Sequence, residues 1–420
     1  MLLMNKEIKL NNYFKKINNT LFVCYQPNFE DFRAVISSKV SREIILQKKS
    51  FMNAENIKQF LLQNLAKYNH ASIGEMCILT IYHFGFGWVS SFLLCDQPLF
   101  IGQEVSTRAV DILKSVNNIC YDSNNVKGAL ESFVFFKNIF LNLKQSSLTQ
   151  KKGYKFDYIR WCLPGNISTG LIYNVNGRVL SRHLNILKNF NFMKRVVEQY
   201  ELGFKTIAPN IFISLNKSRK NINIPSNIKI QNIEQRDRFK ICDIEWINKP
   251  KKLHLIIDML INKYSKNLKL EYLPLELKKL GLFNVNIYCS IAAARDWHRH
   301  RPVMPWTISL ILDQDNLPII YHMYDKYILD KHKILINKFF KQKQFFKNKN
   351  KINWPDLYVL PFGTMVVMNC TTTLDYLFYM LKLRSNSKNA NFEYKKQAEV
   401  GLLLLKRMLP QRLMDHFNLK

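Results

Sequence analysis

The sequence lacks the patterns that define several common functional classes. Its eight cysteines include no C-x-x-C pair, so neither a zinc site nor a disulfide framework is indicated, and buried free thiols in a reducing compartment fit better. No apolar run reaches about 18 residues, and the first residues lack the sustained apolar segment of a signal peptide. We therefore expect a soluble cytoplasmic protein without a bound metal or a membrane partner.

Acidic residues are scarce as well. The 31 Asp and Glu residues stand against 62 Lys and Arg residues, and the formal net charge is +31. A strongly basic chain can indicate a nucleic-acid partner, but the lysines here accompany abundant Asn and Ile, which an AT-rich genome tends to accumulate by drift. Nucleic-acid binding is therefore kept as an alternative and is not favoured.

Length and periodicity indicate two or three domains of mixed α/β class. At 420 residues with 47% hydrophobic residues, the chain can bury large cores. Helical periodicity predicts helices near 55–67, 126–146, 177–203, 253–265, 371–384 and 393–408. Strand-like runs occur near 20–25, 32–38, 76–84, 286–294, 307–313 and 363–369. Polar residues predict a linker at 216–232, between domains at 1–215 and 233–420.

The two halves contain similar parts in the same order. Each has a helical segment, an apolar strand, a polar cluster, a Leu-Pro dipeptide, a Thr-containing strand and a long terminal helix. The dipeptides are Leu163-Pro164 and Leu360-Pro361. A repeat this long indicates tandem domains and not a solenoid, so we interpret the order as an internal duplication that has diverged.

A basic cluster, Arg299-His300-Arg301, lies between two segments that should be buried. Ile291 to Ala294 precede it, and Pro302 to Trp306 follow it. Cationic and donor groups are costly to hold together unless an anion lies among them. The cluster is therefore a candidate anion site, with a solvated charged turn as the alternative.

Two polar segments of the first half suit a phosphate or ribose contact. His70 to Glu75 lead into an apolar strand, and Gly102 to Arg108 follow further along the chain. Small side chains let the backbone approach a ligand, and Arg supplies a bidentate charge. Structural alternatives are that Ser72 caps a turn and that Glu104 and Arg108 form an ion pair on a helix.

In this order the segments resemble the flavin-dependent thymidylate synthases (the ThyX family), whose pattern is H-x-S-x-x-E and then R-H-R-x-x-S-x-N-E-x-S-x-R. The match is divided between the halves. The second half carries Arg299-His300-Arg301, but only Ser309 remains of the polar residues that follow. The first half has Asp96-Gln97-Pro98 in place of R-H-R. It carries the other polar positions as His70, Ser72, Glu75, Glu104, Ser106 and Arg108.

The same division recurs toward the end of each half. Arg160 resembles a nucleotide-contacting arginine of the family, and Asn176-Gly177-Arg178 resembles the N-x-R that contacts flavin. The second half has Thr373 and Asp375 at the N-x-R positions, but it keeps the family's next arginine as Arg384. Each half has lost what the other keeps, which fits family sites assembled from several subunits.

The resemblance implies a fold, an assembly and a reaction. The fold would be two tandem ThyX-like α+β domains, each a mainly antiparallel sheet with packed helices, pairing as a pseudo-dimer. A homodimer of this chain would then mimic the family's tetramer. The reaction would be reductive methylation of dUMP to dTMP, with FAD as cofactor and with NADPH and methylenetetrahydrofolate as co-substrates. The site would be composed from both halves.

The resemblance also implies residue roles. Arg384 would be the catalytic residue, because a fixed cation beside the uracil ring stabilises negative charge that develops there. The flavin contacts would be His70, Ser72, Asn176, Arg178, Arg299, His300 and Arg301. The dUMP contacts would be Glu104, Ser106, Arg108, Arg160 and Arg384. No cysteine needs a covalent role. The alternative is a cofactor-less protein that retains the fold and binds nucleic acid or serves as a structural subunit.

Overall fold

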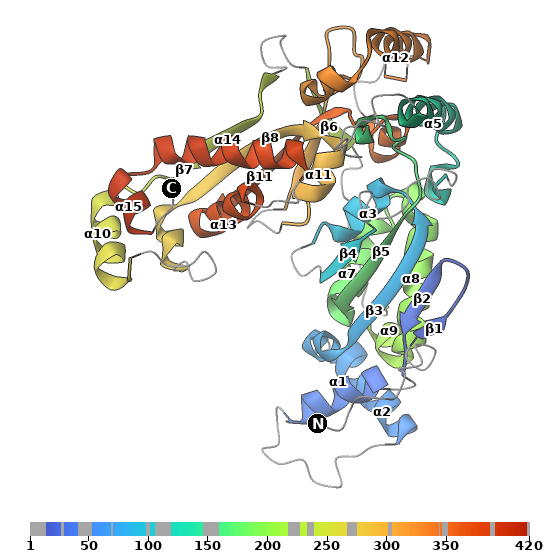
Figure 1. Ribbon diagram of the computed structural model, residues 1–420. Coiled ribbons are helices and arrows are strands. Elements are labelled where there is room, and N and C mark those ends of the chain that lie inside the picture. Colours follow the sequence, from blue (N-terminus) through green and yellow to red (C-terminus); the bar gives the residue numbers. More distant parts are fainter. Residues whose placement is uncertain are drawn as a thin grey trace, which may run out of the picture. The chain divides into compact units, whose positions relative to one another are not determined.

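The chain forms two compact units of α+β structure (Figure 1). The computed structural model describes residues 14–26, 29–40, 53–68, 70–97, 101–105, 119–145, 159–216, 227–232, 239–266, 275–300, 305–343, 345–346, 352–386 and 391–417. Unit 1 comprises Met1–Asn125 and Asn166–Ser226, and unit 2 comprises Val126–Gly165 and Asn227–Lys420. Each unit has a mainly antiparallel sheet with packed helices, which confirms the predicted fold class.

Unit 1 is built on a five-stranded sheet of order β1-β2-β3-β5-β4, in which every pairing is antiparallel. Its strands are Phe14–Lys16 (β1), Leu21–Cys24 (β2), Ile78–Phe86 (β3), Ile101–Glu104 (β4) and Thr169–Asn176 (β5). Its helices are Phe29–Val40 (α1), Ala54–Leu61 (α2), Leu62–Lys67 (η3), Ala71–Met76 (η4), Trp88–Cys95 (α3), Tyr121–Ser123 (η5), Gly177–Leu187 (α7), Asn191–Met193 (η8), Lys194–Ile207 (α8) and Pro209–Asn216 (α9). Helix α8 packs on β2 and β3, and Trp88, Tyr173 and Tyr200 are buried in the core.

Unit 2 is built on a six-stranded sheet of order β10-β6-β9-β11-β8-β7, in which β6 and β9 are the parallel pair. Its strands are Asn227–Asn232 (β6), Cys242–Ile247 (β7), Leu282–Ser290 (β8), Thr307–Leu312 (β9), Ile352–Asn353 (β10) and Met365–Thr373 (β11). Its helices are Ala129–Gln145 (α5), Arg160–Cys162 (η7), Leu253–Lys263 (α10), Leu275–Leu280 (η11), Ile291–Trp297 (α11), His322–Tyr327 (η12), Asp330–Lys343 (α12), Trp354–Val359 (η13), Leu374–Ser385 (α13), Phe392–Met408 (α14) and Gln411–His416 (α15). Helices α13 and α14 pack against each other and against the sheet (Figure 1).

The two sheets share one succession of strands. The order β2-β3-β5-β4 in unit 1 matches β7-β8-β11-β9 in unit 2. In each unit a helix follows the second of these strands directly, and two longer helices follow the third. Such a repeated order is what a duplicated sequence would produce. That the two halves are duplicated, ThyX-like copies stays a prediction.

Segment 126–165 belongs to unit 2, although the sequence-based boundaries assign it to the first domain. Helix α5 packs on α12 with the rings of Phe135 and Phe339 stacked at 4.1 Å. The backbone N–H of Gly363 donates to the carbonyl oxygen of Trp161 at 2.7 Å, and Pro164 bridges to Pro361. The Leu-Pro segments of the two sequence halves therefore lie side by side and antiparallel inside one unit.

Four local expectations differ from the observed structure. The strand-like run 32–38 lies in helix α1, and the predicted strand 286–294 ends at Ser290, where α11 begins. The predicted helix 177–203 is interrupted by η8 between α7 and α8. Residues 227–232, expected in the linker, form β6. In the α11 case Ser290 caps the helix, because its side chain accepts a hydrogen bond from the backbone N–H of Ala293.

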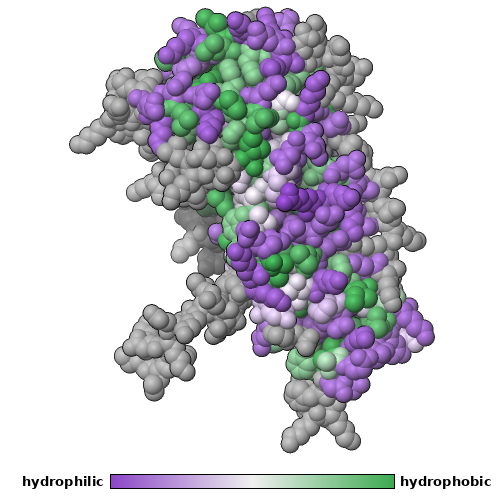
Figure 2. Space-filling view, turned by 90° about the vertical axis from the view of Figure 1, so that its right-hand side faces the viewer, coloured by the Kyte–Doolittle hydropathy of each residue, from purple (hydrophilic) through white to green (hydrophobic). Residues whose placement is uncertain are grey.

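The surface mixes polar and apolar residues. Figure 2 shows one face on which hydrophilic residues (purple) surround smaller hydrophobic areas (green). No described helix combines the length and the apolar character that crossing a membrane requires.

Candidate functional site

The predicted residues of the second half gather at the C-terminal end of α11 in unit 2. The apolar run from Ile291 to Ala294 is fully buried in this helix, which then delivers Arg295, Asp296 and Trp297 to its last turn. Arg299 and His300 follow directly, with the Arg299 side chain half-exposed and His300 buried. The helix thus carries the basic cluster from the core to the surface.

Asp296 is the carboxylate at the centre of this cluster. Its Oδ2 accepts a hydrogen bond from Arg160 Nη1 at 3.2 Å, and its Oδ1 lies 3.8 Å from Arg299 Nη2. Burial raises the pKa of the Asp296 carboxyl, but Arg160 and Arg299 outweigh burial, so this pKa lies below its ordinary value. Asp296 therefore stays charged and holds two guanidinium groups that come from different sequence halves.

Arg160 is buried, with 2% of its surface exposed. Besides Asp296, it donates from Nη2 to the carbonyl oxygen of Ala292 at 3.1 Å. It therefore anchors η7 to α11. The predicted contact between Arg160 and dUMP stays a prediction, and it would require a ligand that reaches this buried ion pair.

Arg384 joins the cluster from α13. Its Nε donates to His300 Nε2 at 3.0 Å, and its Cζ lies 5.0 Å from the ring centroid of Tyr394 on α14. The Tyr394 hydroxyl lies 2.7 Å from the same His300 nitrogen and donates to the carbonyl oxygen of Asp296 at 3.2 Å. The residue predicted to be catalytic is thus held by an imidazole and a phenol.

A buried polar network fastens α14 to the start of α11. The Glu393 carboxylate accepts hydrogen bonds from the Ser290 backbone N–H and hydroxyl, both at 2.7 Å, and from the Tyr324 hydroxyl at 2.8 Å. Trp297 Nε1 donates to Gln397 at 2.7 Å. Burial raises the pKa of Glu393. These bonds fix the helix that carries Tyr394.

Unit 1 brings together another set of predicted residues. His70 and Ser72 lie at the exposed start of η4, and Glu75 on the same short helix pairs with Arg178 on α7. Asn176 caps α7 because its side chain accepts a hydrogen bond from the Val179 backbone N–H at 2.9 Å. The H-x-S-x-x-E and N-x-R segments, far apart in sequence, are therefore neighbours.

The remaining predicted residues stand apart from this group or lie outside the described residues. Glu104 ends β4, and its carboxylate accepts a hydrogen bond from Thr169 at 3.4 Å. Ser106, Arg108 and Arg301 fall in stretches that the structure does not describe.

Sequence reasoning missed Tyr394, Glu393 and Gln397. A signal for them exists, because polar residues at positions 393, 394 and 397 share the buried stripe of α14 with Ala398, Gly401 and Leu405. Polar side chains on a buried helical stripe need partners, and such partners often belong to a site.

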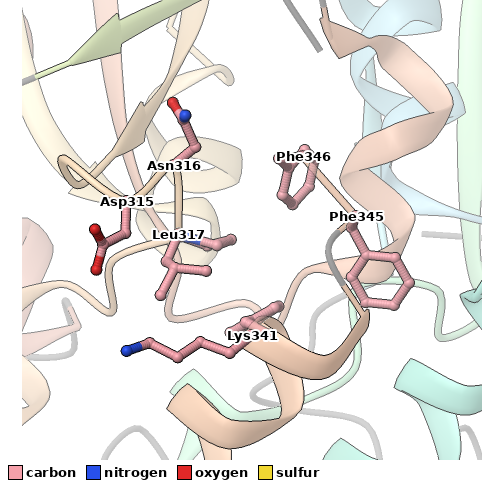
Figure 3. Close-up of a pocket in the computed structure, with 8 residues that line it drawn as sticks. Asp315, Asn316, Leu317, Lys341, Phe345 and Phe346 are labelled. Atoms are coloured by element: carbon pink, nitrogen blue, oxygen red, sulfur yellow. The ribbon is translucent and has the colours of Figure 1, made fainter. Parts of the chain in front are cut away.

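A pocket of about 340 Å³ lies elsewhere in unit 2, beside α12 (Figure 3). Phe340, Phe345, Phe346, Leu317 and Pro318 form its apolar wall, and Asp315, Asn316 and Lys341 add polar groups. Its lining includes none of the residues of the basic cluster. Within the described part of the chain, no group of three or more His, Cys, Asp or Glu residues is arranged to hold a metal.

Comparison with known proteins gives little more. No protein-family model matches the chain, and no curated protein matches it. A solved structure with partial similarity is that of the UMP/dUMP methylase PolB from Streptomyces cacaoi, bound with 5-Br dUMP. The TM-score is 0.34 at 14% sequence identity, and the match covers 44% of this chain and 90% of that chain.

Proposed function

We propose that the protein is a flavin-dependent thymidylate synthase of the ThyX type, which converts dUMP to dTMP with methylenetetrahydrofolate as the carbon donor and NADPH as the reductant. The observation that carries the proposal is the basic cluster of unit 2. Arg160, Arg299, His300 and Arg384 come from three separate sequence segments, and each is joined to the cluster through Asp296 or Tyr394. The ThyX resemblance names these same four residues.

The cluster also supports the idea that both halves of the sequence contribute to one site. Arg160 belongs to the first half, and its partner Asp296 belongs to the second. Loss of either partner would leave a buried charge uncompensated, which is costly, so the pair couples the two sequence halves within unit 2. That the predicted residues of unit 1 contribute to the site stays a prediction.

The residues present fit an anionic dinucleotide such as FAD. In unit 2 the Arg299 side chain is 48% exposed beside Asp296. In unit 1 the Arg178 side chain is 49% exposed beside Glu75, and Ser72 offers an exposed hydroxyl on η4, which packs on α7. Each arginine therefore presents a partly exposed guanidinium group that suits a phosphate. When bound, the flavin would supply the hydride that completes the methyl group. The chain itself would bind, orient and stabilise charge.

Arg384 has the clearest mechanistic role. Its Nε is occupied by His300, and no described carboxylate pairs with its guanidinium. Arg384 is partly exposed, and in the proposed site its Nη edge would face the ligand that carries negative charge. A cation held in this way requires little reorganisation as charge builds on a pyrimidine ring, which is the condition for electrostatic catalysis.

The test is turnover together with a visible absorption spectrum. Arg384→Ala should lower dUMP-dependent turnover by on the order of a hundredfold or more. Flavin should stay bound, so the yellow absorbance should remain. Arg412→Ala is the matched control, because Arg412 is a surface arginine paired with Asp258. Unchanged turnover in Arg384→Ala, or loss of flavin from it, would contradict the assignment.

A second variant tests the flavin contact. Arg301→Ala should weaken flavin retention, measured as the ratio of flavin to protein absorbance after purification. A wild-type protein that carries no flavin and refuses added FAD would instead favour the cofactor-less alternative. Nucleic-acid binding that weakens steeply with salt would support that alternative directly.

A further inference from the structure

His300 was expected to contact flavin, but its ring is turned toward the protein interior. It is 5% exposed, and its Nε2 atom lies within hydrogen-bond distance of both Arg384 Nε and the Tyr394 hydroxyl. The Trp297 ring packs edge-on against the Tyr394 ring, with 4.2 Å between the ring centroids. The Nε2 atom of His300 therefore forms its hydrogen bonds with Arg384 and Tyr394.

The partners of His300 Nε2 decide where its proton lies. A guanidinium N–H can only donate, so the Nε2 atom that faces Arg384 must offer a lone pair. A protonated Nε2 would set two N–H groups against each other at 3.0 Å. With its proton on Nδ1, the neutral ring offers this lone pair, and the Tyr394 hydroxyl, 2.7 Å from the same atom, then faces Nε2 with its own proton.

Tyr394 acts on Arg384 in two ways. Its ring lies under the guanidinium at 5.0 Å, which is a cation–π distance, and its hydroxyl supports the imidazole that accepts from Nε. Burial raises the pKa of Tyr394 well above its ordinary value, so the hydroxyl keeps its proton. The hydroxyl has a single proton, which His300 Nε2 at 2.7 Å and the Asp296 carbonyl oxygen at 3.2 Å share as acceptors, and both acceptors lie at the C-terminal end of α11.

We propose that Tyr394 and a neutral His300 are positioning residues that fix the Arg384 guanidinium, with its Nη edge presented to ligand. Neither residue needs to touch the substrate. The choice of dUMP as probe rests on the proposed function, whereas the positioning itself rests on the contacts within unit 2.

The first experiment measures the tautomer and needs no substrate. The full-length protein, labelled with ¹⁵N-histidine, is studied by NMR near neutral pH, and the His300 signals are identified by their loss in His300→Gln. An unprotonated Nε2 with a proton on Nδ1 is expected. In Arg384→Ala, Nε2 loses the donor that requires its lone pair, and its signal should move toward the protonated form. A wild-type His300 protonated at Nε2 overturns the proposal.

The second experiment measures dUMP affinity by calorimetry. Tyr394→Phe removes one hydrogen-bonding group and should weaken binding about fivefold. Tyr394→Leu also removes the ring below Arg384 and should weaken it further. Tyr173→Phe is the control, because it removes a buried tyrosine hydroxyl that accepts a hydrogen bond from Gln97 in unit 1, outside the network that holds Arg384. Equal affinities for Tyr394→Leu and the control would overturn the proposal.

Rescue at His300 separates positioning from simple packing. His300→Gln keeps an acceptor for Arg384 Nε and should retain most of the affinity, whereas His300→Leu should lose it. A purely structural role predicts the reverse order, because an apolar side chain suits a buried position better than an amide does. If the wild-type protein binds no dUMP, the proposed function fails, and the tautomer measurement alone decides the positioning.

Discussion

Asp296 and Arg160 form a buried ion pair in unit 2. The two side chains are 10% and 2% exposed and lie 3.2 Å apart. We expect Asp296→Ala to lower the free energy of unfolding by about 3 kcal/mol, because it leaves a buried guanidinium without its counter-charge. The double variant Arg160→Leu/Asp296→Leu should cost less, since it removes both charges. Urea unfolding measures both, and a double variant less stable than the single would contradict this account.

The acid sensitivity of this pair has a defined sign. The Asp296 pKa is depressed in the folded protein, so the unfolded chain takes up a proton first as pH falls. The stabilisation is therefore complete above the ordinary carboxyl pKa of about 4, and it is lost as pH falls through the lower folded-state value.

His83 should make unit 1 sensitive to acid at a higher pH. Burial, with a smaller contribution from Arg195, lowers its pKa from 6.5 to about 3. Below about pH 6.5 the unfolded chain therefore binds a proton at His83, whereas the folded chain does not. The free energy of unfolding declines from there toward pH 3. Replacing it in His83→Phe should flatten this dependence by about 1 kcal/mol per pH unit between pH 4 and 6. Urea titrations at several pH values measure the slope, and an unchanged slope would refute the prediction.

At the scale of elements, local periodicity predicted the helices and strands whose own sequence pattern matches their final state. Helix α14 and strand β9 were found within one residue of their expected bounds. The run at 32–38 was mistaken for a strand because its helical state depends on residues far along the chain. Asp31 on α1 accepts hydrogen bonds from the side chain of Asn210 at 2.8 Å and from the backbone N–H of Ile211 at 3.2 Å. No local pattern contains that information.

The same limit applies to the site. The resemblance located Arg299, His300 and Arg384 by their order in sequence, which a motif can carry. It could not reveal Tyr394, because its importance arises only when α11, α13 and α14 pack together. Residues that act by holding another residue leave weaker motifs than residues that touch a ligand.

Where the two Leu-Pro segments pair, there is no room for a side chain at two glycines. A Cβ added to Gly165 would lie 2.1 Å from the Leu360 carbonyl oxygen, and one added to Gly363 would lie 2.6 Å from Trp161 Cβ. Alanine at either position should destabilise unit 2 by roughly 1–3 kcal/mol, because the neighbours cannot yield without moving backbone.

Gly74→Ala is the control for these variants, since its added Cβ would meet the flexible end of Leu215 at 3.3 Å. Thermal unfolding compares the three variants. A Gly165→Ala protein as stable as Gly74→Ala would show that the two Leu-Pro segments pack less tightly than the structure indicates.

At the scale of the whole molecule, the chain path links the sequence halves more closely than a simple linker would. Segment 126–165 leaves unit 1, contributes α5 and η7 to unit 2, and then returns. Its contacts there include the Phe135–Phe339 stack and the bond from the Ser132 hydroxyl to the Val359 carbonyl oxygen. Unit 2 is therefore incomplete without a part encoded in the first half.

Cutting the chain between residues 217 and 226 tests this organisation. A protease site inserted there would yield fragments 1–226 and 227–420, and we expect the fragments to elute together in gel filtration after cleavage. The reason is that 126–165 in the first fragment supplies a stacked ring, the arginine of a buried ion pair and one of the two paired Leu-Pro segments. The matched control deletes 126–165 before cleavage, and fragment 227–420 should then aggregate, because the apolar surface of α12 and η13 loses its cover. Fragments that separate in native buffer, or a soluble folded 227–420 on its own, would show that the two sequence halves are independent domains.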